Sequence, residues 1–328
     1  MTENPLESGS VALVGHTGFV GNSLKRQYKY FRGAYNSENI SDISGKAYDA
    51  LICAAAPATM WLANNDPEKD RQNLLDLTAW LEKANCKRVV LISTIAVLDD
   101  FAGRYSEENA SFESAKAYGK NRRELEERIQ SAFPSVHIMR LPALFGPGLK
   151  KNYIFDVLNP APAFLKRGKA EELRAEMSKG DIDLFGKAYE YDPDIDMLKL
   201  DRSVYTDSSY RELIDAVFER AGFTSKFFTN SQSTFQYYNM NNLWDDISKV
   251  VVNNLTALHV CSAPLSAGDI HLRLTGRSFS SLSPHEHHED MRSIHSEIWG
   301  ENDHYLYPAD KIMADLEAYY NSIKSAHS

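Results

Sequence analysis

The sequence contains few cysteines and no long apolar run, and both shortages exclude classes of protein. Its three cysteines, Cys53, Cys86 and Cys261, are far apart, and no two of them have metal-site spacing. Buried free thiols in a reducing cytoplasm are the simplest interpretation. No segment approaches the roughly 20 apolar residues of a membrane helix, and the start, Met1 to Ser10, lacks the apolar stretch of a signal peptide. We therefore expect a soluble, cytoplasmic protein with no membrane segment.

Basic residues are also in the minority, with 36 Lys and Arg against 45 Asp and Glu, for a formal net charge of −9. This balance argues against a nucleic-acid-binding surface, because such a surface favours a basic patch. It does not exclude anionic small substrates, since one pocket can be basic in an acidic protein. At 328 residues the chain is long enough for one two-lobed unit or two close domains.

The most informative segment is the run from Val11 to Gly21, Val-Ala-Leu-Val-Gly-His-Thr-Gly-Phe-Val-Gly. Four apolar residues predict a buried strand, three glycines follow at three-residue spacing, and an amphipathic stretch comes next. A strand, a glycine turn and a helix in this order place a dinucleotide pyrophosphate against a helix N-terminus. Gly15 permits the tight turn, Gly18 the approach of the phosphates, and Gly21 the packing of helix on strand. The alternative is a glycine-rich turn that binds nothing.

Strand-like and helix-like segments alternate through the first half of the chain. Apolar runs predict strands at Val11–Val14, 50–56, 88–97 and Val136–Leu141, and helical spacing predicts helices at 22–30, 68–84 and 113–133. Alternation of this kind predicts a parallel sheet with helices on both faces, an α/β doubly wound fold of the Rossmann type.

The sequence changes character after Gly148. Residues 151–234 are mixed and polar, with one helix expected at 210–221, and a helix at 239–253, a strand at 258–261 and a helix at 309–323 follow. We expect residues 1–148 to form a dinucleotide-binding domain to which 235–258 return. Residues 149–234 and 259–328 are then expected to form a smaller, mixed substrate-binding lobe.

Several landmarks follow the glycine run in order. They are the small-residue strand end Ala54-Ala55-Ala56, Asn73, Ser93-Thr94, Tyr118 opening Tyr-Gly-Lys-Asn-Arg, and the segment Arg140-Leu-Pro-Ala-Leu-Phe-Gly-Pro-Gly. With these landmarks the chain resembles the extended short-chain dehydrogenase/reductase family, which includes nucleotide-sugar epimerases, dehydratases and reductases. The resemblance covers most of the chain, and the second half matches only loosely.

The resemblance implies catalytic roles for Thr94, Tyr118 and Arg122. Tyr118 acts as the acid or base, and Thr94, or Ser93, hydrogen-bonds the reacting oxygen. A free tyrosine has a pKa of about 10, and a cation one helical turn away favours its ionised form. The implied NAD(P) contacts are Gly15, Thr17, Gly18, Phe19, Val20, Gly21, Asn36, Ser37, Ala54, Ala55, Ala56, Asn73, Tyr118, Arg122 and Leu141.

The chain departs from the family pattern at the cation, where lysine is usual and Arg122 stands here. Arginine keeps the charge but is larger and planar, so the site is either adapted, weakened or repurposed. The alternative is that Tyr118 is a packed core tyrosine and Arg122 a solvated helix charge. Ile95 and Ala96 follow Thr94 where dehydratases carry acids, which lowers the dehydratase interpretation and leaves simple hydride transfer.

The second strand is expected to end near Tyr35, where an acidic residue would bind ribose hydroxyls and favour NAD. Asn36 and Ser37 are instead suited to donate to a 2′-phosphate, which favours NADP weakly, and Glu38 favours NAD if it points inward. The alternative is that Asn36 and Ser37 only form a turn.

The substrate candidates are Trp61, Asn64, Ser93 and Tyr237. Helix capping by Asn65 or Asp66 ahead of Pro67 explains the Trp61 segment equally well, and core packing is the simpler role of Tyr237. The tract from His285 to Asp290 is interpreted as a solvated loop, so no metal site is expected.

These observations predict an NAD(P)-dependent oxidoreductase that acts on a sugar-like, nucleotide-linked small molecule. An epimerase that retains NAD and a catalytically decayed dinucleotide-binding regulatory protein are the alternatives. The family resemblance also implies a homodimer, with the helices at 68–84 and 113–133 forming a four-helix interface.

Overall fold

The computed structural model describes residues 4–193, 195–205 and 208–327. Their contacts divide the chain into two compact units. The first contains the residues up to Leu149 with Thr234–Leu265 and His288–Asp315, and the second contains Lys150–Ser233, Ser266–His287 and the residues from Leu316 onward.

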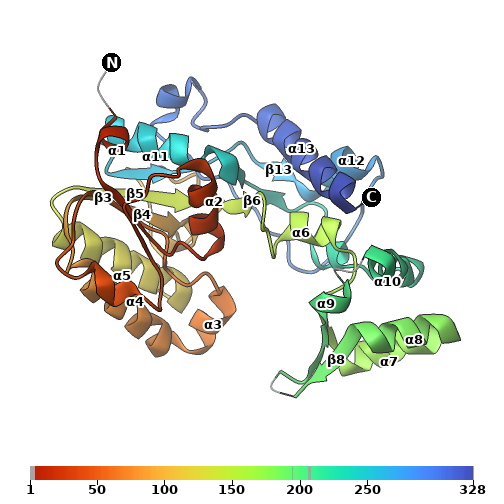
Figure 1. Ribbon diagram of the computed structural model, residues 1–328. Coiled ribbons are helices and arrows are strands. Elements are labelled where there is room, and N and C mark those ends of the chain that lie inside the picture. Colours follow the sequence, from red (N-terminus) through yellow and green to blue (C-terminus); the bar gives the residue numbers. More distant parts are fainter. Residues whose placement is uncertain (1–3, 194, 206–207, 328) are drawn as a thin grey trace. The chain divides into compact units, whose positions relative to one another are not determined.

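A six-stranded sheet forms the centre of the first unit (Figure 1). Its strands are β1 (Val11–Val14), β2 (Gly33–Tyr35), β3 (Ala47–Cys53), β4 (Asn85–Thr94), β5 (Val136–Leu141) and β12 (Ala257–His259), in the order β12-β5-β4-β3-β1-β2. Every neighbouring pair is parallel. The central strands are apolar and buried, as a sheet covered on both faces requires. The expected doubly wound parallel sheet is confirmed.

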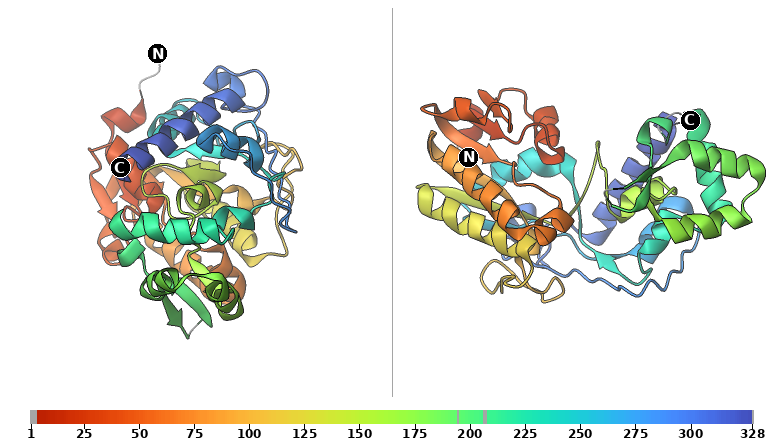
Figure 2. Two further views of the ribbon diagram at one scale, coloured as in Figure 1. Left: turned by 90° about the vertical axis from the view of Figure 1, so that its right-hand side faces the viewer. Right: turned by 90° about the horizontal axis from the view of Figure 1, so that it is seen from below.

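Helices cover both faces of this sheet. On one face α4 (Pro67–Leu81) packs beside α5 (Ala117–Ala132), and Figure 2 shows these two helices side by side in orange and yellow. On the other face α11 (Leu243–Val252) packs on α1 (Pro5–Ser8) and α2 (Phe19–Gln27). The remaining elements of the first unit are η1 (Ile40–Ile43), α3 (Met60–Asn65), η2 (Ile95–Val97), β6 (Ala143–Phe145), β10 (Thr234–Phe235), β11 (Tyr237–Asn239), η4 (Met240–Asn242) and η5 (Ser296–Trp299).

The second unit contains regular structure where the sequence pattern was mixed. Its antiparallel sheet has the strand order β7-β9-β8, formed by β7 (Phe164–Lys166), β8 (Tyr189–Asp192) and β9 (Met197–Leu200). Its helices are α6 (Tyr153–Leu158), α7 (Arg167–Glu176), α8 (Lys179–Ala188), α9 (Arg202–Tyr205), α10 (Ser208–Arg220), η3 (Ser225–Phe228) and α12 (Ala267–Thr275). The short strand β13 (Leu265–Ser266) and the final helix α13 (Ala309–His327) each begin in the first unit and end in the second.

Several helix and strand boundaries differ from the expected ones for local reasons. Helix α2 begins three residues earlier than expected, because Gly18 already takes the N-cap position. Helix α5 begins four residues later, because the Glu113 carboxylate accepts from the N–H groups of Ala115 and Lys116 and holds them outside the helix. Strand β4 ends at Thr94, whose hydroxyl accepts from Ala96 N and starts η2.

The two units divide the second half of the chain differently from the expected domain boundaries. Residues 288–315 belong to the first unit, whereas the sequence grouped all of 259–328 in one lobe. Within the first unit, Ser262 pairs with Tyr307, and the Glu107 carboxylate accepts from Ser293 Oγ at 2.8 Å and Ile294 N at 3.0 Å. These long-range contacts leave no signal in the periodicity of the sequence.

Candidate active site

The glycine turn between β1 and α2 has the geometry that its spacing predicts. Gly15 adopts φ +89, and its N–H donates to the carbonyl of Tyr35 at 2.7 Å. A Cβ on Gly15 would overlap the carbonyl oxygen of Ala54, and one on Gly21 would overlap that of Gly15. Gly18 is different, because a Cβ there would meet only the Gly15 oxygen at 3.5 Å. Two glycines are therefore required by packing, and the third leaves open space on the exposed side of the turn.

The N-terminus of α2 fits a pyrophosphate. Its N-cap, Gly18, makes no side-chain capping bond, and the first turn contains no acidic residue. The first N–H groups of a helix have no partner within the helix and carry partial positive charge, so they bind anions. Thr17 is exposed in the turn, and Phe19, Val20 and Gly21 form the first helical turn.

The predicted strand-end residues lie at one edge of the sheet. Ala54, Ala55 and Ala56 follow β3, Thr94 ends β4, and Leu141 ends β5. These strands are parallel neighbours in the order β3, β4, β5, so their carboxyl ends meet at the same edge. Because Gly15 abuts Ala54, the glycine turn adjoins this edge.

Tyr118 is the second residue of α5, which packs against β4 and η2. Its backbone N–H donates to Oδ1 of Asn64 on α3 at 3.0 Å. Its ring is buried with Ala63 and Ala96, and Phe101 packs against this cluster. The tyrosine therefore lies beside the end of β4, in a small apolar cluster.

Opposing influences act on the phenol of Tyr118. Burial raises its pKa above the ordinary value, and the neighbouring charge of Arg122 opposes that rise. The charge of Asp70 raises the pKa further, and the nearby Thr94 hydroxyl lowers it. The structure thus brings the predicted trio Thr94, Tyr118 and Arg122 together, with Asp70 as a fourth member.

Arg122 is almost fully buried and ion-paired. Its Nη2 donates to Asp70 Oδ1 at 2.9 Å and to the Pro57 carbonyl, and its Nη1 donates to Asp70 Oδ2 and to the Tyr118 carbonyl. These bonds use the four hydrogens of the two terminal nitrogens. The buried Nε has no hydrogen-bond partner among the described residues. The guanidinium carbon lies 3.8 Å from the centroid of the Tyr118 ring, over its face.

Asp70 was missed by the sequence reasoning, although a signal for it exists. Leu74, Thr78 and Leu81 mark the buried stripe of α4, and one turn before Leu74 the same stripe reaches Asp70. Asp70 is only 6% exposed. An acid on the buried side of a helix needs a cation opposite it, and Arg122 occupies the corresponding stripe of α5.

Ser93 is engaged away from any reacting group. Its hydroxyl donates to Glu126 Oε1 at 2.6 Å. Glu126 is fully buried and binds Arg140 through both carboxylate oxygens, at 3.0 and 2.7 Å. Arg140 in turn donates from Nη1 to His259 Nε2 at 2.9 Å. Thr94 is thus the hydroxyl of the pair that faces Tyr118.

The other predicted residues occupy varied environments. Trp61 and Asn73 are exposed, on α3 and α4. Asp66, not Asn65, caps α4 ahead of Pro67, accepting from Lys69 N at 3.2 Å. Tyr237 is buried in β11, which pairs with β6, and its ring lies against Phe145 and Phe235. Asn36 Oδ1 accepts from the N–H groups of Glu38 and Asn39, forming the expected turn, and Ser37 is exposed.

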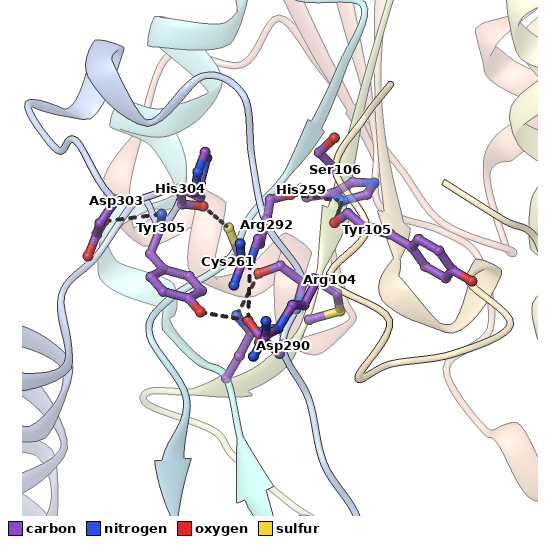
Figure 3. Close-up of polar contacts among 12 residues, drawn as sticks. Arg104, Tyr105, Ser106, His259, Cys261, Asp290, Arg292, Asp303, His304 and Tyr305 are labelled. Atoms are coloured by element: carbon purple, nitrogen blue, oxygen red, sulfur yellow. Dashed lines mark hydrogen bonds and ion pairs between the residues drawn. The ribbon is translucent and has the colours of Figure 1, made fainter. Parts of the chain in front are cut away.

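The loop between η2 and α5 carries Phe101, which packs against the cluster that contains Tyr118. A later segment of the first unit binds this loop, and Figure 3 shows its Asp290 beside Arg104 of the loop. The N–H of Asp290 donates to the Phe101 carbonyl at 2.7 Å, and the N–H of Arg292 donates to that of Tyr105 at 2.9 Å. The Asp290 carboxylate accepts from Arg104 Nε at 2.9 Å and from the Tyr305 hydroxyl at 2.6 Å.

His259 contacts both this loop and the later segment that binds it. Its Nδ1 is 3.2 Å from the carbonyls of both Tyr105 and Arg292, and its backbone N–H donates to Glu107 at 2.7 Å. Because Nε2 accepts from Arg140, the imidazole is neutral with its proton on Nδ1. Burial lowers the pKa of His259, which agrees with the neutral form.

No family model matches the chain, and no curated protein matches its sequence. Solved structures do match it. RMD from Pseudomonas aeruginosa, complexed with NADPH, is 14% identical, with 96% of this chain and 99% of that chain covered at a TM-score of 0.58. UDP-N-acetylglucosamine 4-epimerase from Methanobrevibacter ruminantium, in complex with UDP-N-acetylmuramic acid, is 12% identical over 97% and 99%, at 0.59. dTDP-4-dehydrorhamnose reductase from Yersinia enterocolitica is 13% identical over 96% and 99%, at 0.56. The chain therefore shares the fold of these proteins over nearly its whole length.

The described residues contain neither a membrane-spanning helix nor a cluster of metal-binding side chains. None of the helices is both long enough and apolar enough to cross a membrane. No group of three or more His, Cys, Asp or Glu in the described ranges is placed to hold a metal ion. In the tract beginning at His285, one contact is between His288 Nδ1 and Thr234 Oγ1, which are 3.0 Å apart.

Proposed function

We propose that the protein is an NAD(P)-dependent oxidoreductase of the extended short-chain dehydrogenase/reductase type. It transfers a hydride at a carbonyl or hydroxyl carbon of a sugar-like, nucleotide-linked substrate. One observation carries the proposal: Thr94 ends β4 and Tyr118 lies on α5, which packs on β4 and η2, at the sheet edge that adjoins the glycine turn. In a doubly wound sheet this edge is where a cofactor and its substrate bind.

When bound, the cofactor supplies the hydride, and the chain supplies the proton and the binding groups. The Thr94 hydroxyl polarises the reacting oxygen, and the Tyr118 hydroxyl transfers the proton. The turn from Gly15 to Gly21 binds the pyrophosphate, the alanines after β3 border the nicotinamide side, and Asn73 and Leu141 complete the cofactor contacts. Trp61 and Asn64 are the substrate candidates on the neighbouring helix α3. The NADPH and the UDP-sugar bound by proteins of the same fold support a dinucleotide and a nucleotide-linked substrate.

NADP is the proposed cofactor rather than NAD. The residue that follows β2 is Asn36, and its side-chain oxygen is occupied by the N–H groups of Glu38 and Asn39. Its amide nitrogen and the exposed Ser37 hydroxyl are the proposed donors to a 2′-phosphate. Tighter binding of NADH than of NADPH would reverse this assignment.

The first experiment is to denature the purified protein, identify any released dinucleotide, and titrate the emptied protein with NADPH and NADH. Reversible binding with a preference for one reduced cofactor supports a reductase or dehydrogenase and justifies a screen of sugar nucleotides. Tightly retained, non-exchanging NAD supports an epimerase instead. Absence of binding to any dinucleotide contradicts both enzyme functions.

The proton-transfer role is tested with Tyr118→Phe. We expect turnover to be abolished with little loss of cofactor affinity. Tyr48→Phe is the matched control, because it removes the hydroxyl of a buried tyrosine near the amino end of β3, bonded to Tyr35. Unchanged turnover in Tyr118→Phe would remove the mechanism.

A second candidate is a dinucleotide-binding regulatory protein without catalysis. The full commitment of the Arg122 terminal N–H groups to protein acceptors favours it, because none of these terminal groups is left to bind a ribose. Arg122→Lys distinguishes the two. Raised activity indicates that the site has decayed, and lost activity indicates that Arg122 is adapted to a working site.

We also propose a cytoplasmic homodimer that pairs through α4 and α5. The three free, buried cysteines are compatible with a reducing compartment. The outer surface of these helices carries Arg71, Glu124 and Arg128 in ion pairs. In the proposed dimer this charged surface of one copy packs against the same surface of the other. Sedimentation equilibrium of the protein tests this, and a mass of one chain, 37.0 kDa, contradicts it.

A further inference from the structure

The side chains around Tyr118 come from several elements, and two charged groups of the described residues act on its phenol. Helix α3 contributes Ala63 and the Asn64 amide, the end of β4 and η2 contribute Thr94 and Ala96, and the next loop contributes Phe101. The charged groups are Arg122 on α5 and Asp70 on α4. The ionic surroundings of Tyr118 are thus set by a single buried ion pair.

Asp70 determines where the charge of Arg122 lies. Two carboxylate oxygens bind two terminal nitrogens, a geometry that fixes the plane of the guanidinium. The Pro57 carbonyl holds one of those nitrogens from the other side. The guanidinium is thereby held over the face of the Tyr118 ring. The negative charge of Asp70 lies so close to the guanidinium that it cancels much of the positive potential of Arg122 at the Tyr118 phenol. Solvent weakens this effect little, because both groups are buried.

We propose that Asp70 is a positioning residue that holds Arg122 against Tyr118 and offsets its charge, so that the buried Tyr118 phenol holds its proton more firmly than it would beside an unpaired cation. This inference rests on the proposed function, and it specifies that the enzyme works in the direction of carbonyl reduction. A site with a protonated tyrosine is prepared to reduce a carbonyl, whereas the oxidation of an alcohol needs the phenolate.

The reductive step balances as follows. The carbonyl carbon accepts a hydride from a reduced nicotinamide dinucleotide, which is thereby oxidised. The carbonyl oxygen accepts the Tyr118 proton, so one π bond is replaced by a C–H and an O–H bond. Tyr118 is left as a phenolate and takes a proton from solvent before the next turnover.

The test follows the titration of Tyr118 itself in the protein without cofactor. Tyrosine labelled with carbon-13 at Cζ reports ionisation by NMR, and the resonance missing from Tyr118→Phe assigns the signal. In Asp70→Asn the titration midpoint should move to lower pH, because the negative charge is lost while the Pro57 and Tyr118 carbonyls still hold Arg122, whose charge is then no longer offset. An unchanged or higher midpoint in folded Asp70→Asn overturns the proposal.

Asp76→Asn is the matched control. Asp76 lies on the same helix but is exposed and bonded to Gln72, so its loss changes the charge of α4 equally without facing the tyrosine. Its midpoint should equal that of the wild type. An equal shift in both variants would show a general charge effect and would overturn the role of Asp70.

If Asp70→Asn does not fold, the same titration is measured in the double variant Asp70→Asn with Arg122→Gln, in which both residues are neutral. Here the midpoint should rise above the wild-type value, because the cation that opposes the effect of burial is gone as well. Where both variants fold, opposite shifts in the single and double variants are the signature of an offset ion pair. A double variant at or below the wild-type midpoint contradicts the proposal.

Kinetics separates this inference from the proposed function. With an active enzyme, the alkaline limb of kcat/KM for carbonyl reduction should move to lower pH in Asp70→Asn by the same amount as the NMR midpoint. If no substrate is reduced but the NMR midpoint moves as expected, the proposed function fails and the role of Asp70 stands. If turnover depends on Tyr118 but neither the midpoint nor the limb moves, the role of Asp70 fails and the function stands.

Discussion

The glycine turn and the surroundings of Tyr118 lie at the same edge of the sheet, but they are held together in different ways. In the turn, the N–H of Gly18 donates to the carbonyl of Gly15, and Gly21 packs against Gly15. Around the tyrosine, Arg122 binds Asp70 across 52 positions of sequence and Pro57 across 65. The first region is built mainly from its own segment, and the second is built by distant partners.

This difference decides what each region tolerates. Where a glycine of the turn has no room for a Cβ, every other residue destabilises the turn, whatever the chemistry of its side chain. A site that depends on a buried ion pair fails when one partner is removed, and recovers when both are replaced together. The following variants test this contrast, in order from the largest expected loss of stability to the smallest.

The largest effect is expected for Gly21→Ala. The new Cβ would overlap the backbone carbonyl of Gly15 and lie 2.8 Å from His16 Cα, so α2 must shift away from β1. We expect the free energy of unfolding to fall by about 4 kcal/mol or more, measured by urea denaturation.

Gly18→Ala is the matched control in the same turn. Its Cβ meets only the Gly15 oxygen at 3.5 Å, so stability should change by no more than about 1 kcal/mol. Its affinity for a dinucleotide should fall, because the methyl group stands where the phosphates approach. Equal losses of stability in the two variants would contradict the packing argument.

Arg122→Met tests the second region. It leaves the Asp70 carboxylate buried without its cation, and we expect a loss of about 3 kcal/mol in urea denaturation. Adding Asp70→Leu should recover most of that loss, because an apolar pair replaces the ion pair. A double variant less stable than the single would show that the two residues do not act as a pair.

The same contrast explains what the sequence could predict. The strand, glycine turn and helix at the start of the chain and the alternation of strands with helices follow from patterns within about 20 residues, and the doubly wound parallel sheet that they predict is confirmed. The pairing of Thr94 with Tyr118 came from a family resemblance. Asp70 and Phe101 were not foreseen, because their roles depend on which helix or loop packs beside Tyr118.

The second unit shows the other limit of the sequence. The antiparallel strands β7, β8 and β9 are only three or four residues long. An alternation of buried and exposed residues over so few positions is too short to be recognised in the sequence. The core of this unit is nevertheless contiguous, with Phe185, Tyr189 and Phe218 in ring contact. Short elements are specified there by contacts between them.

A smaller effect is expected from pH, through His259. Burial lowers its pKa, so the unfolded chain takes up the proton first as pH falls below about 6.5. The contribution of neutral His259 to stability is therefore fully present above that pH and is lost as pH falls toward the folded-state pKa. Wild type should show a lower urea midpoint at about pH 5 than at about pH 8.

His259→Gln should show less of this loss, because glutamine can both accept from Arg140 and donate to a carbonyl without titrating. His285→Gln, at an exposed histidine, is the control and should keep the full wild-type dependence. If His259→Gln lost as much stability on acidification as wild type, another group would be responsible.

The smallest effect is expected for Arg104→Met. Arg104 Nε donates to Asp290 at 2.9 Å, but the arginine side chain is 67% exposed, so solvent screens the pair (Figure 3). The Asp290 carboxylate keeps the Tyr305 hydroxyl, and its backbone N–H still holds the Phe101 carbonyl. We expect a change in unfolding free energy below about 0.5 kcal/mol and an unaltered titration of Tyr118. A loss comparable to that of Arg122→Met would mean that the loop carrying Phe101 depends on its surface ion pair, and the contrast between buried and exposed pairs would not hold.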